Sequence, residues 1–247
     1  MSVPGNNYII VIPARYASSR LPGKPLLEIA GKPLIQHVYE SACNSRADSV
    51  CIATDDDRIR RVAESIGANV IMTLAGHVSG TDRIAEAIKL LDIPDSGIVV
   101  NLQADEIEMP AALLDQVADI LIRNHDANMG TLCEPVEEEA DIKDPNIVKV
   151  VFDRNNRALY FSRAPIPYNR VDGYSDYYRH IGLYAYRAGF LKELAQLTPC
   201  QLELAESLEQ LRALYYGVNI FIEPACEPPG FGVDTEEDLQ RARTALR

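Results

Sequence analysis

The chain has 247 residues, an apolar fraction of 47% and a formal net charge of −12. This length and composition predict one large α/β domain, or such a domain with an inserted lobe. The charge argues against nucleic acid or an anionic membrane as a main partner, and no apolar run is long enough to cross a bilayer.

The first predicted strand, residues 9–12, consists of four apolar β-branched residues, a pattern typical of a strand buried on both faces. We expect the strand to end at Pro13, which has no N–H to donate. Three cations follow, Arg15, Arg20 and Lys24, with no acidic neighbour in the local sequence. Since α/β sheets bind ligands at the carboxyl ends of strands, these cations predict a site for a polyphosphate. The alternative is a solvated basic loop. Neither a P-loop nor a G-x-G-x-x-G motif is present here.

Strand and helix patterns then alternate up to residue 102. We expect strands at 49–53, 69–72 and 98–102, and helices at about 33–42, 56–66 and 80–91. This alternation predicts a mostly parallel sheet with helices on both faces. Right-handed crossovers bring the loops that follow the strands to one edge, where the basic loop would meet Asp55, Gln103 and Asp105.

The rhythm changes from about residue 135, and we expect a smaller lobe over approximately 135–217. The acidic run 137–141 predicts a solvated loop. Further strands are expected at 148–152, 158–161, 181–186 and 221–222, and helices at 191–197, 202–216 and from Thr235 onward. The apolar face of 202–216 is broad enough to be covered by a second copy of the chain, although packing within one chain would also explain it.

Asp105 is the strongest single candidate for a chemical role, because it follows the strand 98–102 at the edge that presents the cations. A carboxylate among bound phosphates requires a divalent cation between them, and Mg²⁺ prefers carboxylate, phosphate and water oxygens. Asp234 is the expected second ligand. For Asp234 taken alone, a helix N-cap is the alternative interpretation.

Residues 13–26, PARYASSRLPGKPL, resemble the signature loop of the sugar-acid cytidylyltransferases, and most closely that of the 3-deoxy-manno-octulosonate (Kdo) cytidylyltransferases. The resemblance continues, in the family's order, through ATD at 53–55, SGTDR at 79–83, NLQADE at 101–106, ALYFSR at 158–163, RHIG at 179–182, LEQLR at 208–212 and GVDT at 232–235. It implies a Rossmann-like nucleotidyltransferase fold whose smaller lobe carries the sugar site and dimer contacts, and hence a homodimer. The implied reaction is CTP + Kdo → CMP-Kdo + diphosphate, for lipopolysaccharide biosynthesis.

The resemblance also implies roles for individual residues. Catalytic roles fall to Arg15, Lys24, Asp105 and Asp234, the two aspartates being the Mg²⁺ ligands. Nucleotide binding is expected of Ala14, Arg15, Ser18, Arg20, Lys24, Arg83 and Gln103. Binding of the sugar acid is expected of Gln103, Arg163, His180, Glu209 and Gln210. From the residues alone, His180 could equally be structural, and Glu209 and Gln210 could belong to an exposed helix face.

The chain departs from the family's usual pattern at Ala104, where the family has glycine, and at Ile107, where it has proline. If position 104 required a positive φ, alanine would cost about 1 kcal/mol. Ser207 also stands where the family often has methionine. These departures keep two alternatives open: the same reaction on 8-amino-Kdo or a nonulosonic acid, and a non-catalytic CTP-binding paralogue.

Five cysteines are scattered along the chain without a C-x-x-C pair, which predicts reduced thiols and argues against a structural zinc site. The first residues lack the features of a signal peptide. We therefore expect a cytoplasmic protein.

Overall fold

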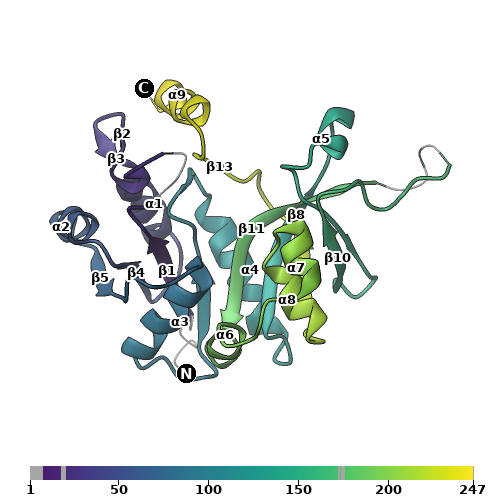
Figure 1. The fold of residues 1–247 in the computed structure, drawn as a ribbon, viewed down its shortest axis with the longest axis horizontal. Coiled ribbons are helices and arrows are strands. Elements are labelled where there is room, and N and C mark those ends of the chain that lie inside the picture. The colour runs from purple at the N-terminus through teal and green to yellow at the C-terminus, as the bar shows by residue number, and fades with distance from the viewer. Residues whose placement is uncertain (1–7, 18–20, 172, 174–175, 247) are drawn as a thin grey trace, which may run out of the picture.

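The computed structural model describes residues 8–17, 21–171, 173 and 176–246, and a nine-stranded sheet forms its centre (Figure 1). The strand order is β10-β9-β11-β6-β1-β4-β5, with β8 beside β11 and β12 beside β8. The strands are β1 (Tyr8–Ala14), β4 (Ser49–Thr54), β5 (Asn69–Met72), β6 (Ile98–Asn101), β8 (Met129–Pro135), β9 (Lys149–Phe152), β10 (Ala158–Ser162), β11 (Tyr178–Arg187) and β12 (Ile220–Pro224). Only β10 and β11 run against the others in this sheet of the described chain. The predicted α/β fold with a mostly parallel sheet is confirmed.

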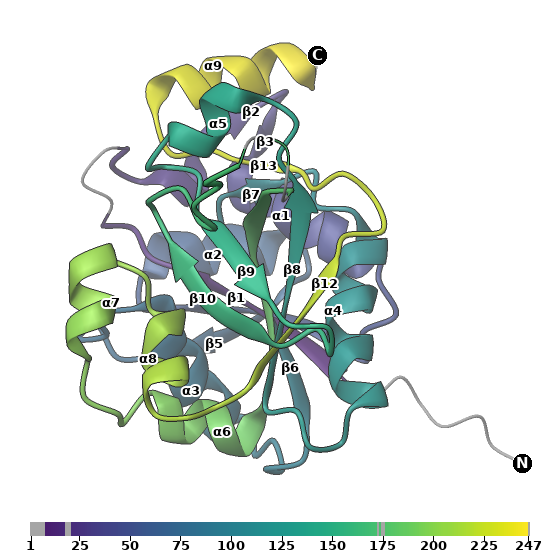
Figure 2. The ribbon, with the colours of Figure 1, turned by 90° about the vertical axis from the view of Figure 1, so that its right-hand side faces the viewer.

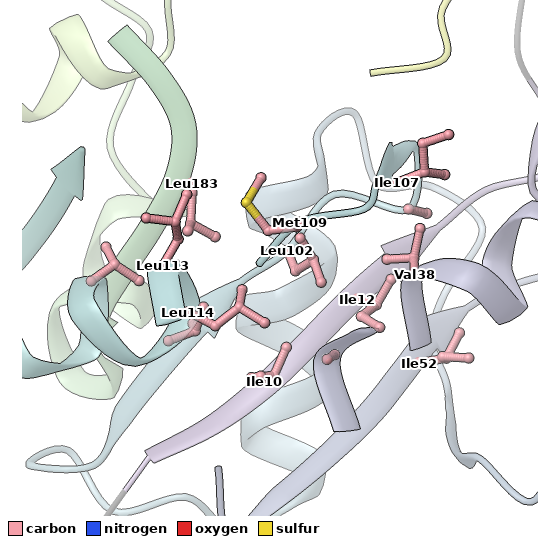
Figure 3. Packing of buried hydrophobic residues seen from close by; sticks show 14 of the residues in the cluster. Ile10, Ile12, Val38, Ile52, Leu102, Ile107, Met109, Leu113, Leu114 and Leu183 are labelled. Atoms are coloured by element: carbon pink, nitrogen blue, oxygen red, sulfur yellow. The ribbon is translucent and has the colours of Figure 1, made fainter. Parts of the chain in front are cut away.

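Helices cover both faces of the sheet, and two buried clusters lie between the layers. Ile10 and Ile12 of β1 belong to the cluster that also receives α1, α2, α4 and α9 (Figure 3), whereas Val11 belongs to the cluster that receives α3, α6 and α8. This alternation is the period of two that a strand buried on both faces requires. The helices are α1 (Leu34–Cys43), α2 (Asp57–Ser65), α3 (Gly80–Leu90), α4 (Ala111–Arg123), α5 (Glu139–Lys143), α6 (Ala188–Leu194), α7 (Gln201–Glu206), α8 (Gln210–Tyr215) and α9 (Glu236–Ala245), together with a 3-10 turn, η1 (Lys24–Leu26).

The prediction that Pro13 ends the first strand is wrong, because β1 continues to Ala14 in register with β4. The carbonyl of Val11 accepts a hydrogen bond from Leu102 N–H at 3.3 Å, so the backbone groups of Val11, and of Pro13 two residues on, face β6. Pairing with β6 stops at Val11. The N–H that proline lacks would therefore point to the side where the ladder has already ended, and pairing with β4 is unaffected.

Two further predictions need correction. Part of the acidic run expected to be a loop forms the short exposed helix α5, in which Lys143 pairs with Glu139 one turn away. The expected single helix 202–216 is two helices, α7 and α8, which are separated at Ser207 with a left-handed φ of 52°. Helix α4 and strand β8 were not predicted from the sequence.

Two helix ends have the capping geometry that their residues favour. Gly67, with φ of 80°, follows the end of α2, and Thr235 caps α9 in a reciprocal pair with Asp238. The stretch 135–217 supplies β9, β10 and β11 to the main sheet, and α7 and α8 lie beside β10 (Figure 2). None of the described helices combines the length and apolar character that crossing a bilayer requires.

Two small antiparallel strand pairs lie outside the main sheet. β2 (Glu28–Ile29) pairs with β3 (Lys32–Pro33), and β7 (Glu106–Ile107) pairs with β13 (Phe231–Gly232), which comes from the other end of the chain. Figure 1 shows β13 leading into α9 beside this part of the molecule. The pairing of β7 with β13 ties the segment before α9 to the loop after β6.

Candidate active site

A cleft of about 330 Å³ opens at the carboxyl ends of β1 and β6. Its walls come from the basic loop, the segment before α3, the loop after β6 and the segment before α9. The lining residues are Pro13, Arg15, Lys24, Pro25, His77, Val78, Ser79, Gly80, Arg83, Gln103, Ala104, Asp105 and Asp234. The cleft therefore brings together the predicted cations and both predicted carboxylates.

Lys24 joins the two carboxylates. Its ammonium donates to Asp105 in a very short contact and to Asp234 Oδ1 at 2.9 Å. The Lys24 side chain is only 13% exposed. Burial lowers the pKa of Lys24, but the charges and hydrogen bonds of Asp105 and Asp234 outweigh this effect, and the pKa lies above its usual value. Lys24 is therefore a cation held between two acids.

The backbone before Lys24 is fixed by a turn at Gly23, whose φ of 70° suits glycine. Gly23 N–H donates to the carbonyl of Tyr16 at 3.1 Å, which closes the loop between them. The Arg58 guanidinium lies 3.3 Å from the centre of the Tyr16 ring, and Arg58 is itself paired with Asp56. These contacts brace the described part of the basic loop from the start of α2.

Asp234 reaches the cleft because β13 approaches β7 very closely. Val233 N–H donates to the carbonyl of Asp105 at 3.0 Å. A Cβ added to Gly230 would lie 2.0 Å from the carbonyl oxygen of Ile107, so no other residue fits there without a backbone shift. This close crossing places Asp234 beside Asp105, although 128 residues of chain separate the two positions.

The other predicted nucleotide-binding residues differ in how firmly they are held. The buried Arg83 donates to Thr73 Oγ1 at 2.5 Å and pairs with Asp55 at 3.2 Å. Arg15 is exposed at the cleft and makes no ion pair or side-chain hydrogen bond within the described residues. Ala14 is buried at the end of β1. Ser18 and Arg20 lie outside the described residues.

A smaller cavity of about 70 Å³ adjoins the cleft and shares Gly80 and Gln103 with it. Its other lining residues are Thr81, Asn101, Met129, Tyr184, Tyr186, Leu194, Glu209 and Gln210. Gln103 therefore lies where the two cavities meet. This position agrees with the expectation that Gln103 contacts both the nucleotide and the sugar. Glu209 and Gln210 line a cavity rather than an exposed helix face.

Glu209 is a half-buried residue, and one oxygen of its carboxylate accepts no hydrogen bond. Its Oε2 accepts a hydrogen bond from Thr81 Oγ1 at 2.8 Å. Its Oε1 is buried 3.6 Å from the Arg212 guanidinium and has no hydrogen-bond partner in the described structure. Burial raises the pKa of Glu209, and the Thr81 hydrogen bond and Arg212 oppose that change. Buried polar atoms are normally satisfied, so an unused acceptor beside a cavity indicates a place for a ligand's donor.

Tyr184 is a candidate that the sequence analysis missed. Its side chain lines the smaller cavity and the residue is 9% exposed, and its buried hydroxyl has no hydrogen-bond partner among the residues described. Burial raises the pKa of Tyr184 well above its usual value, so the hydroxyl remains a donor. The spacing of Tyr184 and Tyr186 along the expected strand could have indicated that both rings share one face; the rings are stacked 5.8 Å apart.

The structure does not bring His180 into either cavity lining. His180 packs against the rings of Phe161 and Tyr184, and its Nε2 lies 3.0 Å from Thr131 Oγ1. Burial lowers the pKa of His180 to about 3, so the ring is neutral near pH 7. A neutral imidazole would not attract a sugar carboxylate by charge, and the geometry favours a structural role.

Arg163 also lies outside both linings, because its guanidinium is engaged with the backbone. It donates to the carbonyls of Glu206 at 2.6 Å, Pro145 at 2.8 Å and Ser207 at 3.4 Å. In this arrangement Arg163 stabilises the break between α7 and α8. Its predicted contact with the sugar acid has no support in this geometry.

Two of the departures from the family's pattern, at Ala104 and Ile107, are accommodated locally. Ala104 is not one of the described residues with positive φ, so the alanine carries no left-handed strain. Ile107 is fully buried and pairs with Phe231 in the β7–β13 crossing. Next to it, burial and the charges of Asp105 and Asp234 raise the pKa of Glu106 to about 7.

The two carboxylates around Lys24 fit a magnesium ion that binds together with phosphate. Oxygens of Asp105 and Asp234 already contact one ammonium, so both can reach one cation. No group of three or more metal-binding side chains occurs in the described ranges. Mg²⁺ typically takes only one or two protein carboxylates and completes its shell with phosphate and water oxygens.

Comparisons with known proteins agree with this geometry. The family model described as Cytidylyltransferase matches residues 9–220. The 3-deoxy-manno-octulosonate cytidylyltransferase of Thioalkalivibrio sulfidiphilus is 54% identical, covering 98% of this chain and 99% of that protein, and that of Hahella chejuensis is 51% identical, covering 97% of each. The solved structure of CMP:2-keto-3-deoxy-manno-octonic acid synthetase complexed with CTP is 42% identical, with a TM-score of 0.92 over 97% of this chain and 98% of that one. The chain belongs to the cytidylyltransferase family.

Proposed function

We propose that this chain transfers CMP from CTP to Kdo, giving CMP-Kdo and diphosphate. The observation that carries the proposal is the meeting of Lys24, Asp105 and Asp234 in a cleft that adjoins a second, smaller cavity. The relatives named as Kdo cytidylyltransferases, and the related synthetase bound to CTP, support the choice of substrates. CTP would occupy the larger cleft and the sugar acid would enter the smaller one.

In this reaction the anomeric hydroxyl attacks the α-phosphate, a new P–O bond forms, and the P–O bond to the β-phosphate breaks. The triphosphate carries about four negative charges, which repel the incoming oxygen. Arg15 and Lys24 would neutralise the phosphates and the departing diphosphate, and the fixed Arg83 would hold the nucleotide in place. Positioning and charge compensation supply most of the acceleration in transfers of this kind.

Asp105 and Asp234 would hold Mg²⁺. When bound, the ion withdraws charge from the α-phosphate and lowers the pKa of the attacking hydroxyl. Gln103, at the junction of the two cavities, would orient the nucleotide relative to the sugar.

In the smaller cavity, Tyr184 offers a hydroxyl donor and Glu209 a carboxylate acceptor. The hydroxyl of Tyr184 and Oε1 of Glu209 are buried, and neither atom has a hydrogen-bond partner among the described residues. Gln210 lines the same cavity. A site built to hydrogen-bond substrate hydroxyls rejects analogues that lack them, because its own polar groups are then left unpaired.

Glu209 also favours a second candidate substrate. A buried carboxylate oxygen that accepts no hydrogen bond would pair well with an ammonium group, so 8-amino-Kdo could supply a charged donor to it. A panel of sugar acids separates this reaction from the one with Kdo.

The test is magnesium-dependent release of diphosphate from CTP with Kdo, 8-amino-Kdo and a nonulosonic acid. We expect release with Kdo and a much lower kcat/KM with the others. A higher kcat/KM with 8-amino-Kdo or the nonulosonic acid would replace Kdo as the substrate. Binding of CTP with no release for any sugar acid would overturn the proposal and favour a non-catalytic paralogue.

We also propose that the protein acts as a homodimer in the cytoplasm. Exposed apolar side chains occur on β10, on α7, on and just after α8, and on the loop between β10 and β11. They are Leu159, Tyr168, Val171, Leu202, Leu204, Tyr215 and Tyr216. The ribbons of α7 and α8 lie beside β10 (Figure 2). A second copy would cover this face. The five cysteines, which all lie within the described residues, are free thiols, and this suits a reducing compartment such as the cytoplasm. Light scattering should give twice the chain mass, and Leu204→Glu should shift the protein to monomer; a monomeric wild type would refute the dimer.

A further inference from the structure

The place where a cation would bridge Asp105 and Asp234 is taken by the Lys24 ammonium. Its nitrogen is within hydrogen-bond distance of an oxygen from each carboxylate. A magnesium ion bound by the same oxygens would sit about 2.0–2.1 Å from each of them. The ammonium and the metal cannot both occupy that space, because they would repel each other at very short range.

In the absence of a ligand, the two carboxylates hold Lys24 in place. Its side chain is 13% exposed, and its ammonium contacts an oxygen of each of the two carboxylates. Moving the ammonium away from the two acids would leave a partly buried charge without its partners, which is costly. A free metal ion would therefore have to displace a cation that loses both of its carboxylate partners.

We infer that Lys24 is an internal counter-ion which keeps free metal out of the site and surrenders the two carboxylates only when a triphosphate arrives. The lysine stem is flexible, so its ammonium can turn from Asp105 and Asp234 to phosphate oxygens within the same cleft. The nucleotide then supplies the new partner that Lys24 needs, while the metal takes the two carboxylates. Lys24 thereby selects the metal–nucleotide complex over the metal alone.

The exchange makes metal binding and nucleotide binding mutually dependent. A nucleotide that draws Lys24 away raises the affinity for the metal, and by linkage the metal raises the affinity for the nucleotide by the same factor. This inference rests on the proposed nucleotide site but not on which sugar acid reacts.

The test measures Mn²⁺ binding to the ligand-free protein by electron paramagnetic resonance of the unbound ion, with no nucleotide or sugar present. We expect Lys24→Met, which keeps the length of the side chain and removes its charge, to bind Mn²⁺ at least 10-fold more tightly than wild type. Adding CTP should raise Mn²⁺ affinity by a larger factor in wild type than in Lys24→Met, because the variant has no ammonium to displace.

Arg15→Met is the matched control. It removes one positive charge from the same cleft, but Arg15 pairs with neither aspartate in the described structure, so its Mn²⁺ affinity should change by less than about 3-fold. The gain in Lys24→Met should vanish when Asp105→Asn is added. Equal gains in Arg15→Met and Lys24→Met, or no gain in Lys24→Met and in Lys24→Gln, would overturn the inference. Since no turnover is measured, failure of the proposed reaction would not alter this result.

Discussion

The larger cleft and the smaller cavity beside it are built from groups of opposite character. The cleft carries charged side chains on loops at strand ends, and Lys24 is stabilised as a cation by Asp105 and Asp234. The smaller cavity is lined by residues in the middle of β11 and after a broken helix, and burial raises the pKa of both Tyr184 and Glu209.

This difference suits two kinds of ligand. A polyphosphate is recognised mainly by charge, which acts over several ångströms and tolerates small displacements. A sugar is recognised by hydroxyl groups, and hydrogen bonds to them weaken steeply with distance and angle. The cleft can therefore be assembled from loops, whereas the smaller cavity requires side chains fixed by a sheet and by the buried Glu203–Arg212 pair next to Glu209.

The largest effect on activity is expected in the larger cleft. Asp105→Asn keeps the size of the side chain and removes the charge that both Lys24 and the proposed metal require, so we expect kcat to fall about 10³-fold with an unchanged circular dichroism spectrum. Diphosphate release measures this change. Asp119→Asn, at a surface pair with Arg46, is the control and should stay near wild-type activity. Activity retained in Asp105→Asn would refute the metal assignment.

The crossing that joins β13 to β7 should be nearly as sensitive. In Gly230→Ala the added Cβ would lie 2.0 Å from the carbonyl oxygen of Ile107, so the backbone must shift and Asp234 must move away from Asp105. We expect about a 10²-fold loss of kcat/KM and a loss of about 1–3 kcal/mol in the free energy of unfolding. Gly182→Ala, where a Cβ meets nothing within 4 Å, is the matched control. Equal behaviour of the two variants would show that the crossing is not needed.

A smaller effect, confined to one substrate, is expected at the second cavity. Tyr184→Phe removes a neutral donor without changing the ring, and one neutral hydrogen bond contributes about 0.5–1.5 kcal/mol. We expect the KM for the sugar acid to rise about 3–10-fold and the KM for CTP to stay constant. Tyr39→Phe, on α1 and outside both cavity linings, should change neither value. A rise in the KM for CTP instead would break the division of labour between the two spaces.

The smallest effect concerns stability and pH. His180 has a pKa of about 3 in the folded protein, against about 6.5 when unfolded. Above pH 6.5 the ring is neutral in both states and its contribution to stability is fully present. Between about pH 6.5 and 3 only the unfolded state gains the proton, so stability falls as the pH falls, by up to about 1.4 kcal/mol per pH unit.

Urea unfolding at pH 7 and pH 5.5 measures this slope. His180→Asn should lose about 1 kcal/mol less stability than wild type over that interval. His125→Asn, in the exposed loop before β8, should keep the wild-type slope. A wild-type slope in His180→Asn would mean that folding does not lower the pKa of His180, which would contradict its assignment as a buried neutral ring.

The sequence predicted the charged residues of the larger cleft better than the residues of the smaller cavity. Asp105 was found because it lies soon after an apolar strand, and Lys24 because it belongs to the basic loop that follows another. Tyr184 was missed because a tyrosine in a strand is ordinary, and only the packing around it shows that its hydroxyl has no partner. Arg163 was placed with the sugar, whereas its backbone contacts depend on the left-handed break at Ser207, which helical periodicity could not reveal.

The most direct measurement is a crystal structure of the protein with CTP and a Kdo analogue that lacks the anomeric hydroxyl. We predict the triphosphate beside Arg15 and Lys24, and the sugar against Tyr184 and Glu209, with its C2 atom turned toward the α-phosphate. A sugar bound at Arg163 and away from the smaller cavity, or a triphosphate that leaves Lys24 on the two aspartates, would contradict the proposed arrangement.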